Sequence, residues 1–153
     1  MITVSNTTAI TTLLKVGRSD LLNGLFGEVW IPTAVEQELL AFHASIPTVC
    51  VAHSVPDSDR LRRLLTQADG GEAEAICLAV EAGADLLLID DKKGRRLAEA
   101  EGVRCLGLPA VVLAAHRRGL VPSIAAFLDS LERQGNYGLS ARAKAQLLRA
   151  AGH

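Results

Sequence analysis

A run of aliphatic residues that ends at two adjacent carboxylates constrains this chain more than any other feature. Residues 86–89 are Leu-Leu-Leu-Ile, and Asp90 and Asp91 follow directly. Four consecutive aliphatic residues indicate a strand buried on both faces, which is typical of parallel sheets covered by helices. Ligands of such sheets bind beyond the carboxyl ends of the strands. The two aspartates therefore lie where a site is expected, although a single acid there is more often only the N-cap of the next helix.

Strand and helix patterns alternate over much of the chain, which ends in three successive helices. Short strands are expected over residues 2–5, 28–31, 86–89 and 103–106, while residues 47–56 are β-biased but ambiguous. Helices are expected over residues 6–15, 20–26, 32–42, 58–67, 72–82, 91–101, 108–118, 121–134 and 140–150. The alternation implies βαβ units, and the 153 residues fit one α/β domain over 1–153.

Composition narrows the classes of protein and partner. A formal net charge of -1 gives no overall basic signature, so any nucleic-acid surface must be local. There is neither an apolar run of the ~20 residues that a membrane span needs nor a basic segment leading into a signal core, and we expect a cytoplasmic protein without membrane contact. Cys50, Cys77 and Cys105 are widely spaced among apolar neighbours, as core thiols are.

Three further polar side chains are candidates for the same crevice as the tandem aspartates. Asn6 follows the first strand and would share that crevice if its strand were a neighbour of the later one, but alone it is better explained as an N-cap. Helical spacing turns Glu38 and Glu72 towards the buried faces of their helices. The same spacing leaves Glu36 and Glu74 nearer solvent.

Carboxylates gathered in this way require a cation. Two inward glutamates and two strand-end aspartates cannot be buried together without one, because repulsion and desolvation would be prohibitive. A crevice rich in oxygen and without inward His or Cys suits Mg²⁺ or Mn²⁺ rather than zinc.

The order of four motifs gives the chain a resemblance to the PIN-domain family. The motifs are Val-Ser-Asn-Thr-Thr at 4–8, Phe-Gly-Glu-Val at 26–29, Gly-Glu-Ala-Glu-Ala-Ile at 71–76 and Leu-Ile-Asp-Asp-Lys-Lys-Gly-Arg-Arg-Leu-Ala at 88–98. The resemblance covers about residues 2–120, the expected core, and helices over 121–150 follow it. It implies a three-layer α/β/α sandwich with a central parallel sheet. It also implies Mg²⁺- or Mn²⁺-dependent RNA cleavage, and many members are VapC-type toxins neutralised by a cognate antitoxin.

The resemblance also assigns residues to the expected metal site. The four acidic positions of the family fall on Asn6, Glu38, Glu72 and Asp91, and Asp90 is an extra acid beside the last. All five are expected to hold the metal, with Glu38, Glu72 and Asp91 catalytic. Asn6 departs from the family pattern, in which nucleolytic members typically carry Asp. An amide oxygen can coordinate a hard cation but brings no charge.

Hydroxyls and cations beside the expected metal site would contact RNA. The hydroxyl that follows the first acidic position matches Thr7 or Thr8, and the cations directly follow the tandem acids. An ordinary solvated helix face explains the cations equally well. The expected RNA-binding residues are Thr7, Thr8, Lys92, Lys93, Arg95 and Arg96.

Two other classes of function compete with the nuclease. One is a PIN module weakened by Asn6 that binds RNA or a protein without turnover. The other is a receiver-like phosphoacceptor, which needs an acid pair after the first strand and a late strand-end lysine, and the chain shows neither. A homodimer through the apolar helices 108–115 and 121–131 is a further expectation, which core packing explains equally well.

Overall fold

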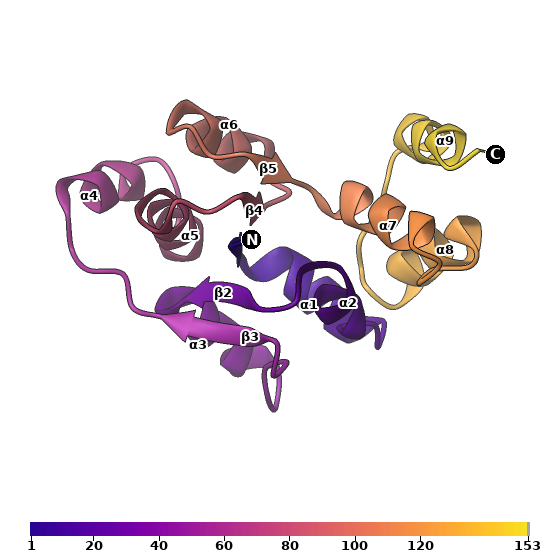
Figure 1. The fold of residues 1–153 in the computed structure, drawn as a ribbon, viewed down its shortest axis with the longest axis horizontal. Helices are drawn as coiled ribbons and strands as arrows, with labels where there is room; N and C mark the ends of the chain where they lie inside the picture. Colours follow the sequence, from indigo (N-terminus) through magenta and orange to yellow (C-terminus); the bar gives the residue numbers. More distant parts are fainter. Residues whose placement is uncertain (153) are drawn as a thin grey trace.

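A central parallel sheet organises the protein. The computed structural model describes residues 1–152; the last residue of the predicted domain, His153, lies outside them. Within the described residues, five strands form one sheet in the order β3-β2-β1-β4-β5, and every neighbouring pair is parallel (Figure 1). The elements are β1 (Thr3–Ser5), α1 (Thr7–Lys15), α2 (Asp20–Phe26), β2 (Val29–Pro32), α3 (Thr33–Phe42), β3 (Cys50–His53), α4 (Asp59–Leu65), α5 (Gly70–Ala82), β4 (Leu86–Leu88), α6 (Lys92–Ala100), β5 (Cys105–Leu106), α7 (Leu108–Arg117), α8 (Ile124–Arg133) and α9 (Ala141–Ala150).

The helices cover both faces of the sheet. Leu87 and Leu88 in β4 point to opposite faces, as successive residues of a strand must, and each belongs to a different hydrophobic cluster. The cluster around Leu88 takes its apolar side chains from α1, α2, α3, α7, α8 and α9, whereas the cluster around Leu87 takes them from α4, α5 and α6. Figure 1 shows α4, α5 and α6 together and apart from α7, α8 and α9. The fold is the predicted three-layer α/β/α sandwich.

Local side chains explain where several helices begin. A Ser or Asp oxygen accepts a hydrogen bond from a backbone N–H of the first turn, which satisfies a donor that the helix itself leaves free. The residues that do so are Ser58 for α4, Asp69 for α5, Asp91 for α6, Ser123 for α8 and Ser140 for α9.

The structure corrects the expected boundaries at three places. The ambiguous stretch 47–56 contains the edge strand β3. Helix α5 includes Gly70 and Gly71, because the cap from Asp69 starts it two residues earlier than expected. Pro32 ends β2 and is the N-cap residue of α3 rather than part of its first turn.

The apolar helices near the C-terminus are occupied within the monomer. Val111, Val112, Phe127 and Leu128 are buried in the cluster around Leu88. These helices therefore need no dimer to cover them, and the homodimer stays a prediction. No helix in the described part of the chain is long and apolar enough to cross a membrane.

Candidate functional site

The strand order places a crevice at the carboxyl ends of β1 and β4. Strands β2 and β3 lie on one side of β1, and β4 and β5 on the other, so the order reverses between β1 and β4. Ser5 pairs with Leu88, and the backbone N–H of Asn6 donates to the carbonyl oxygen of Leu88 over 3.1 Å. Parallel sheets bind ligands at such a reversal. The condition set for Asn6 and the tandem aspartates, that their strands are neighbours, is fulfilled.

Asn6 carries an acceptor that the protein leaves unused. It occupies the N-cap position of α1, yet its side chain makes no capping hydrogen bond. The residue is 4% exposed, and among the described residues its Oδ1 has no hydrogen-bond partner. A buried acceptor without a partner costs about 1–3 kcal/mol. The capping explanation for Asn6 is therefore wrong, and its oxygen is free for a ligand.

Glu38 reaches the same edge of the sheet from α3. Its Oε2 accepts a hydrogen bond of 2.5 Å from the hydroxyl of Thr7, the first residue of α1. Its carboxylate also lies against Gly71 in α5, so closely that a Cβ there would collide with it. Of the two candidate hydroxyls, Thr7 faces Glu38, whereas Thr8 is exposed.

Glu72 lies in the first turn of α5, where other carboxylates surround it. Burial raises the pKa of Glu72, and the nearby charges of Asp69, Asp91 and Glu38 raise it further, while Lys93 opposes them. A Cβ on Gly94 would lie 3.0 Å from Glu72 Oε1, so this glycine lets the first turn of α6 approach the carboxylate. Glu38 and Asp91 are thus each close enough to Glu72 to repel its charge.

The tandem aspartates have different environments. Asp91 is exposed, and its Oδ2 accepts from the backbone N–H of Gly94 over 2.8 Å, which caps α6. Asp90 is half-buried, and its Oδ1 accepts from the N–H of Leu108 over 2.7 Å and from the hydroxyl of Tyr137 over 3.1 Å. The capping role that a strand-end acid commonly has is thus taken by Asp91, whereas Asp90 is drawn to the start of α7.

Burial raises the pKa of Asp90, although the N–H of Leu108, the hydroxyl of Tyr137 and the charge of Arg95 act in the opposite direction. The pKa of Tyr137 is also raised, because its side chain is half-buried and lies next to the negative charge of Asp90. Asp90 therefore anchors the chain after β4 to α7 and to the segment before α9.

Glu74 and two cations of α6 interact with other parts of the protein, although the sequence places them on solvated helix faces. Glu74 is not turned to solvent: it is half-buried, and its Oε1 accepts from the backbone N–H of Ala34 over 3.2 Å, because the start of α3 packs against α5. Among the cations of α6, Lys93 acts on Glu72 and Arg95 on Asp90. Lys92, Lys93 and Arg96 are exposed, and Arg95 is half-buried.

The donor chemistry of this edge fits a hydrated divalent cation. In residues 1–152, no three His, Cys, Asp or Glu side chains are close enough together to hold a metal ion directly. The unpartnered oxygen of Asn6 and the repulsion between Glu72 and its neighbouring carboxylates would nevertheless both favour a bound cation. Mg²⁺ keeps several of its waters and is commonly held by only one or two carboxylates.

Sequence reasoning missed two features of the site. The hydroxyl of Tyr137 donates a hydrogen bond to Asp90, which lies 47 positions earlier in the chain. The sequence offers only one signal for this contact, which is that Tyr137 is the single tyrosine. Three glycines also each lie against a carboxylate: Gly71 against Glu38, Gly94 against Glu72 and Gly107 against Asp90. A Gly-Gly pair such as that at 70–71 is typical of a break in a helix, and the sequence alone gives no sign of the close approach to Glu38.

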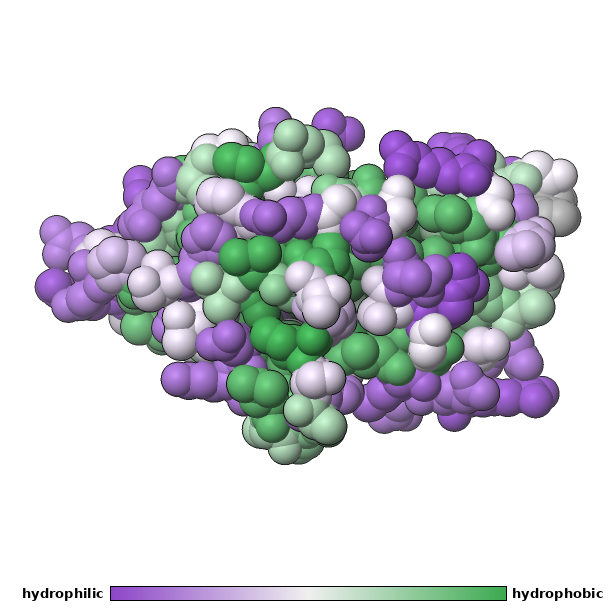
Figure 2. All heavy atoms as spheres, turned by 60° about the horizontal axis from the view of Figure 1, so that its bottom comes forward, coloured by the Kyte–Doolittle hydropathy of each residue, from purple (hydrophilic) through white to green (hydrophobic). Residues whose placement is uncertain are grey.

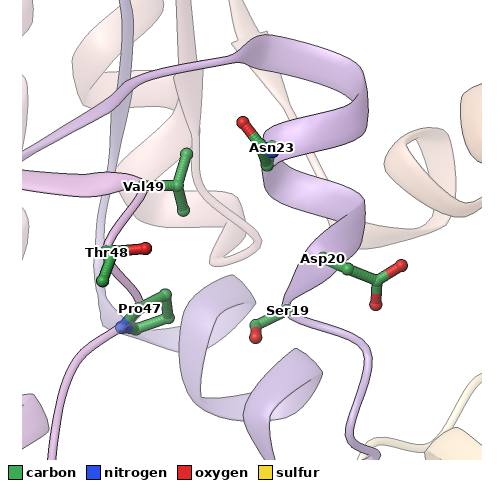
Figure 3. Close-up of a pocket in the computed structure, with 6 residues that line it drawn as sticks. All are labelled: Ser19, Asp20, Asn23, Pro47, Thr48 and Val49. Atoms are coloured by element: carbon green, nitrogen blue, oxygen red, sulfur yellow. The ribbon is translucent and has the colours of Figure 1, made fainter.

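A separate hollow lies at the opposite edge of the sheet. Figure 3 shows it between α2, with Ser19, Asp20 and Asn23, and the segment 47–49 that leads into β3. Asp20 forms an ion pair with Arg18 over 3.0 Å. None of the candidate metal ligands lines this hollow, since they lie at the carboxyl ends of the strands.

The fold and the site define a class of α/β protein with an acidic crevice at the point where the strand order of a parallel sheet reverses. A family model described as PIN domain matches residues 2–153. The chain belongs to the PIN-domain family, and the match extends past the range 2–120 into the C-terminal helices. Membership generally implies nuclease activity. No curated protein matches the chain.

The raised pKa of Glu72 predicts how stability depends on pH. A carboxyl whose pKa is raised above its usual 4.5 by folding contributes stability below that value, and the contribution is lost as the pH rises through the raised pKa. At pH 7 without metal, the charged Glu72 therefore destabilises the fold. Glu72→Gln should raise the melting temperature in chelator at pH 7, by about 2–4 °C for each kcal/mol of relieved repulsion.

Glu74→Gln is the matched control in the same helix, because Gln keeps an oxygen that can accept from Ala34. It should not raise the melting temperature, and the gain from Glu72→Gln should shrink as the pH falls below 4.5, where Glu72 becomes protonated in both the folded and the unfolded state. A Glu72→Gln protein that melts no higher than wild type at pH 7 would show that the carboxylates do not repel one another.

Proposed function

We propose that the protein is a Mg²⁺- or Mn²⁺-dependent endoribonuclease that hydrolyses RNA phosphodiesters. The observation that supports this most is the position of Asn6, Glu38, Glu72 and Asp91 around the carboxyl ends of β1 and β4, with an unpartnered oxygen on Asn6. Membership of the PIN-domain family supports the same reaction.

Each acidic residue has a role in this proposal. Glu38, Glu72 and Asp91 would hold the cation directly or through water, and Asn6 would add a neutral oxygen. A bound divalent cation lowers the pKa of a water molecule and stabilises charge on the phosphate. The hydroxyl of Thr7 fixes the carboxylate of Glu38, and the N–H of Gly94 fixes that of Asp91.

The remaining residues position the site and hold the substrate. Asp90, tied to Tyr137 and Leu108, keeps the chain after β4 in place and is an additional oxygen ligand in this proposal. RNA phosphates would be contacted by the cations of α6 and by the hydroxyls at the start of α1. These residues are Lys92, Lys93, Arg95, Arg96, Thr7 and Thr8.

Cleavage of generic single-stranded RNA tests the proposal. Purified protein with Mn²⁺ should cut a labelled oligonucleotide of mixed sequence, and an excess of chelator should stop the reaction, because no bound cation is then left to lower the pKa of a water molecule. Calorimetric titration with Mn²⁺ should show binding under the same conditions. Absence of cleavage together with measurable Mn²⁺ binding would contradict the nuclease.

A catalytically weakened module is the second candidate, and the neutral side chain of Asn6 favours it. One negative charge fewer lowers the affinity for a divalent cation. Such a protein would bind RNA or a protein partner without turnover. Retention of uncut RNA in the presence of Mn²⁺ would identify it.

The VapC-like motifs also support a role as the toxin of a type II toxin–antitoxin pair, acting in the cytoplasm with a cognate antitoxin. We expect induced expression to arrest growth and co-expression of a small neighbouring open reading frame to restore it. A homodimer belongs to this proposal, and sedimentation of the purified protein would reveal it.

A further inference from the structure

A groove runs from the acidic residues along the surface between α1 and α3. It encloses a cavity of about 450 Å³ lined by Thr7, Thr11, Lys15, Phe42 and His43. Thr7, Thr11 and Lys15 are four residues apart, so they form one stripe along α1. Thr7 bonds to Glu38, and the hydroxyl of Thr11 lies 3.0 Å from Nε2 of His43. One end of the groove is therefore the candidate active site.

An exposed aromatic ring forms one wall of this groove. Phe42 is 84% exposed and is the only aromatic among the exposed large hydrophobic residues of the described chain. It lies four residues after Glu38, on the same side of α3. Figure 2 shows hydrophobic residues gathered in the middle of the face that carries α3 and β3, with hydrophilic residues around them. A phenyl ring left in water beside an acidic site has a free face for a partner.

The other end of the groove carries a free cation. Lys15 is exposed, and among the described residues it has no carboxylate partner. Thr7 and Lys15 are eight residues apart on α1, which corresponds to about 12 Å along the helix axis. The groove thus presents a carboxylate cluster, then hydroxyls beside an aromatic ring, then a positive charge.

We propose that this groove is the subsite for an unpaired nucleotide of the RNA, next to the one that is cleaved. An RNA base stacks on the ring of Phe42, and the phosphate of the following nucleotide lies against Lys15. Stacking on an aromatic side chain combined with a nearby cation is how proteins bind single strands without reading their sequence. A peptide helix would need a row of apolar side chains, whereas Thr7, Thr11, Lys15 and His43 are polar. The proposal rests on the function proposed above.

Fluorescence anisotropy with a labelled single-stranded RNA tests the subsite without cleavage, in the presence of chelator. Phe42→Ala should weaken binding by roughly 5- to 150-fold, the usual range for one stacked base. Phe42→Trp should restore it, and Leu40→Ala, which removes another exposed side chain of α3, should leave it unchanged. Lys15→Gln should weaken binding and reduce the dependence on log salt by about 0.7. Melting curves check that each variant is folded.

An RNA in which single bases are removed one at a time identifies the stacked nucleotide. At one position the wild type should lose affinity, whereas Phe42→Ala should not. Equal RNA affinity of Phe42→Ala and wild type, or no RNA binding by wild type, would overturn the subsite, as would a Phe42→Ala protein altered only in self-association. If Phe42→Ala cleaves RNA as well as wild type does, the proposed subsite is wrong but the proposed nuclease is not. If RNA binding depends on Phe42 but no RNA is cleaved, the proposed nuclease is wrong but the subsite is not.

Discussion

Replacing Asp91 by Asn should reduce metal-dependent RNA cleavage by at least about 100-fold, since even residues that merely orient metal ligands change activity by 10- to 100-fold. Asn keeps an oxygen that can accept from the N–H of Gly94 and is as good an N-cap as Asp. The substitution therefore removes charge and leaves the start of α6 intact. In chelator the variant should melt at or above the wild-type temperature, because repulsion with Glu72 falls.

Asp91→Ala separates the two roles of this residue. It should be equally inactive, but it also loses the cap, at a cost of about 1 kcal/mol. Asp129→Asn is the control for a surface acid, since Asp129 lies in α8 and pairs with Arg133. Cleavage assays and melting curves on the three variants give both readouts, and a fully active Asp91→Asn protein would remove Asp91 from the mechanism.

The fold could be predicted well because hydrophobic patterning decides most of it. Leu87 and Leu88 of the aliphatic run are fully buried in the sheet, and helices begin after capping residues that the sequence makes visible. Strand β3 remained ambiguous because an edge strand with exposed residues lacks the apolar run of a central strand. The boundaries near Gly70 shifted because a cap from Asp69 outweighs the low helix propensity of two glycines.

The candidate site could be predicted only where local position decides the contact. Asn6 and the tandem aspartates follow their strands, so the strand order alone brings them to one edge. The bond from Tyr137 to Asp90 depends on how the chain returns after α8, and no local pattern encodes that path. The same holds for Glu74, whose bond to Ala34 exists because α3 packs against α5.

The second large effect is expected from replacing Asn6, whose side chain is neutral, by Asp. Asn6→Asp would place a charge at a position that is 4% exposed, at the edge of the sheet that already holds the carboxylates around Glu72. The added charge attracts a divalent cation but repels the other acids when the cation is absent. We expect the affinity for Mn²⁺ to rise at least about tenfold, equivalent to about 1.4 kcal/mol, and cleavage to become faster.

The same substitution should destabilise the protein without metal. A buried charge that lacks a partner costs more than the roughly 1–3 kcal/mol of a neutral polar group, so Asn6→Asp should melt clearly below wild type in chelator and regain stability with Mn²⁺. Asn23→Asp adds the same charge on an exposed position of α2 and should change neither property. Calorimetric titration with Mn²⁺ and melting curves with and without chelator separate these outcomes. If Asn6→Asp gains neither affinity nor activity, the oxygen of Asn6 does not face the metal, and the neutral residue is not what limits the nuclease.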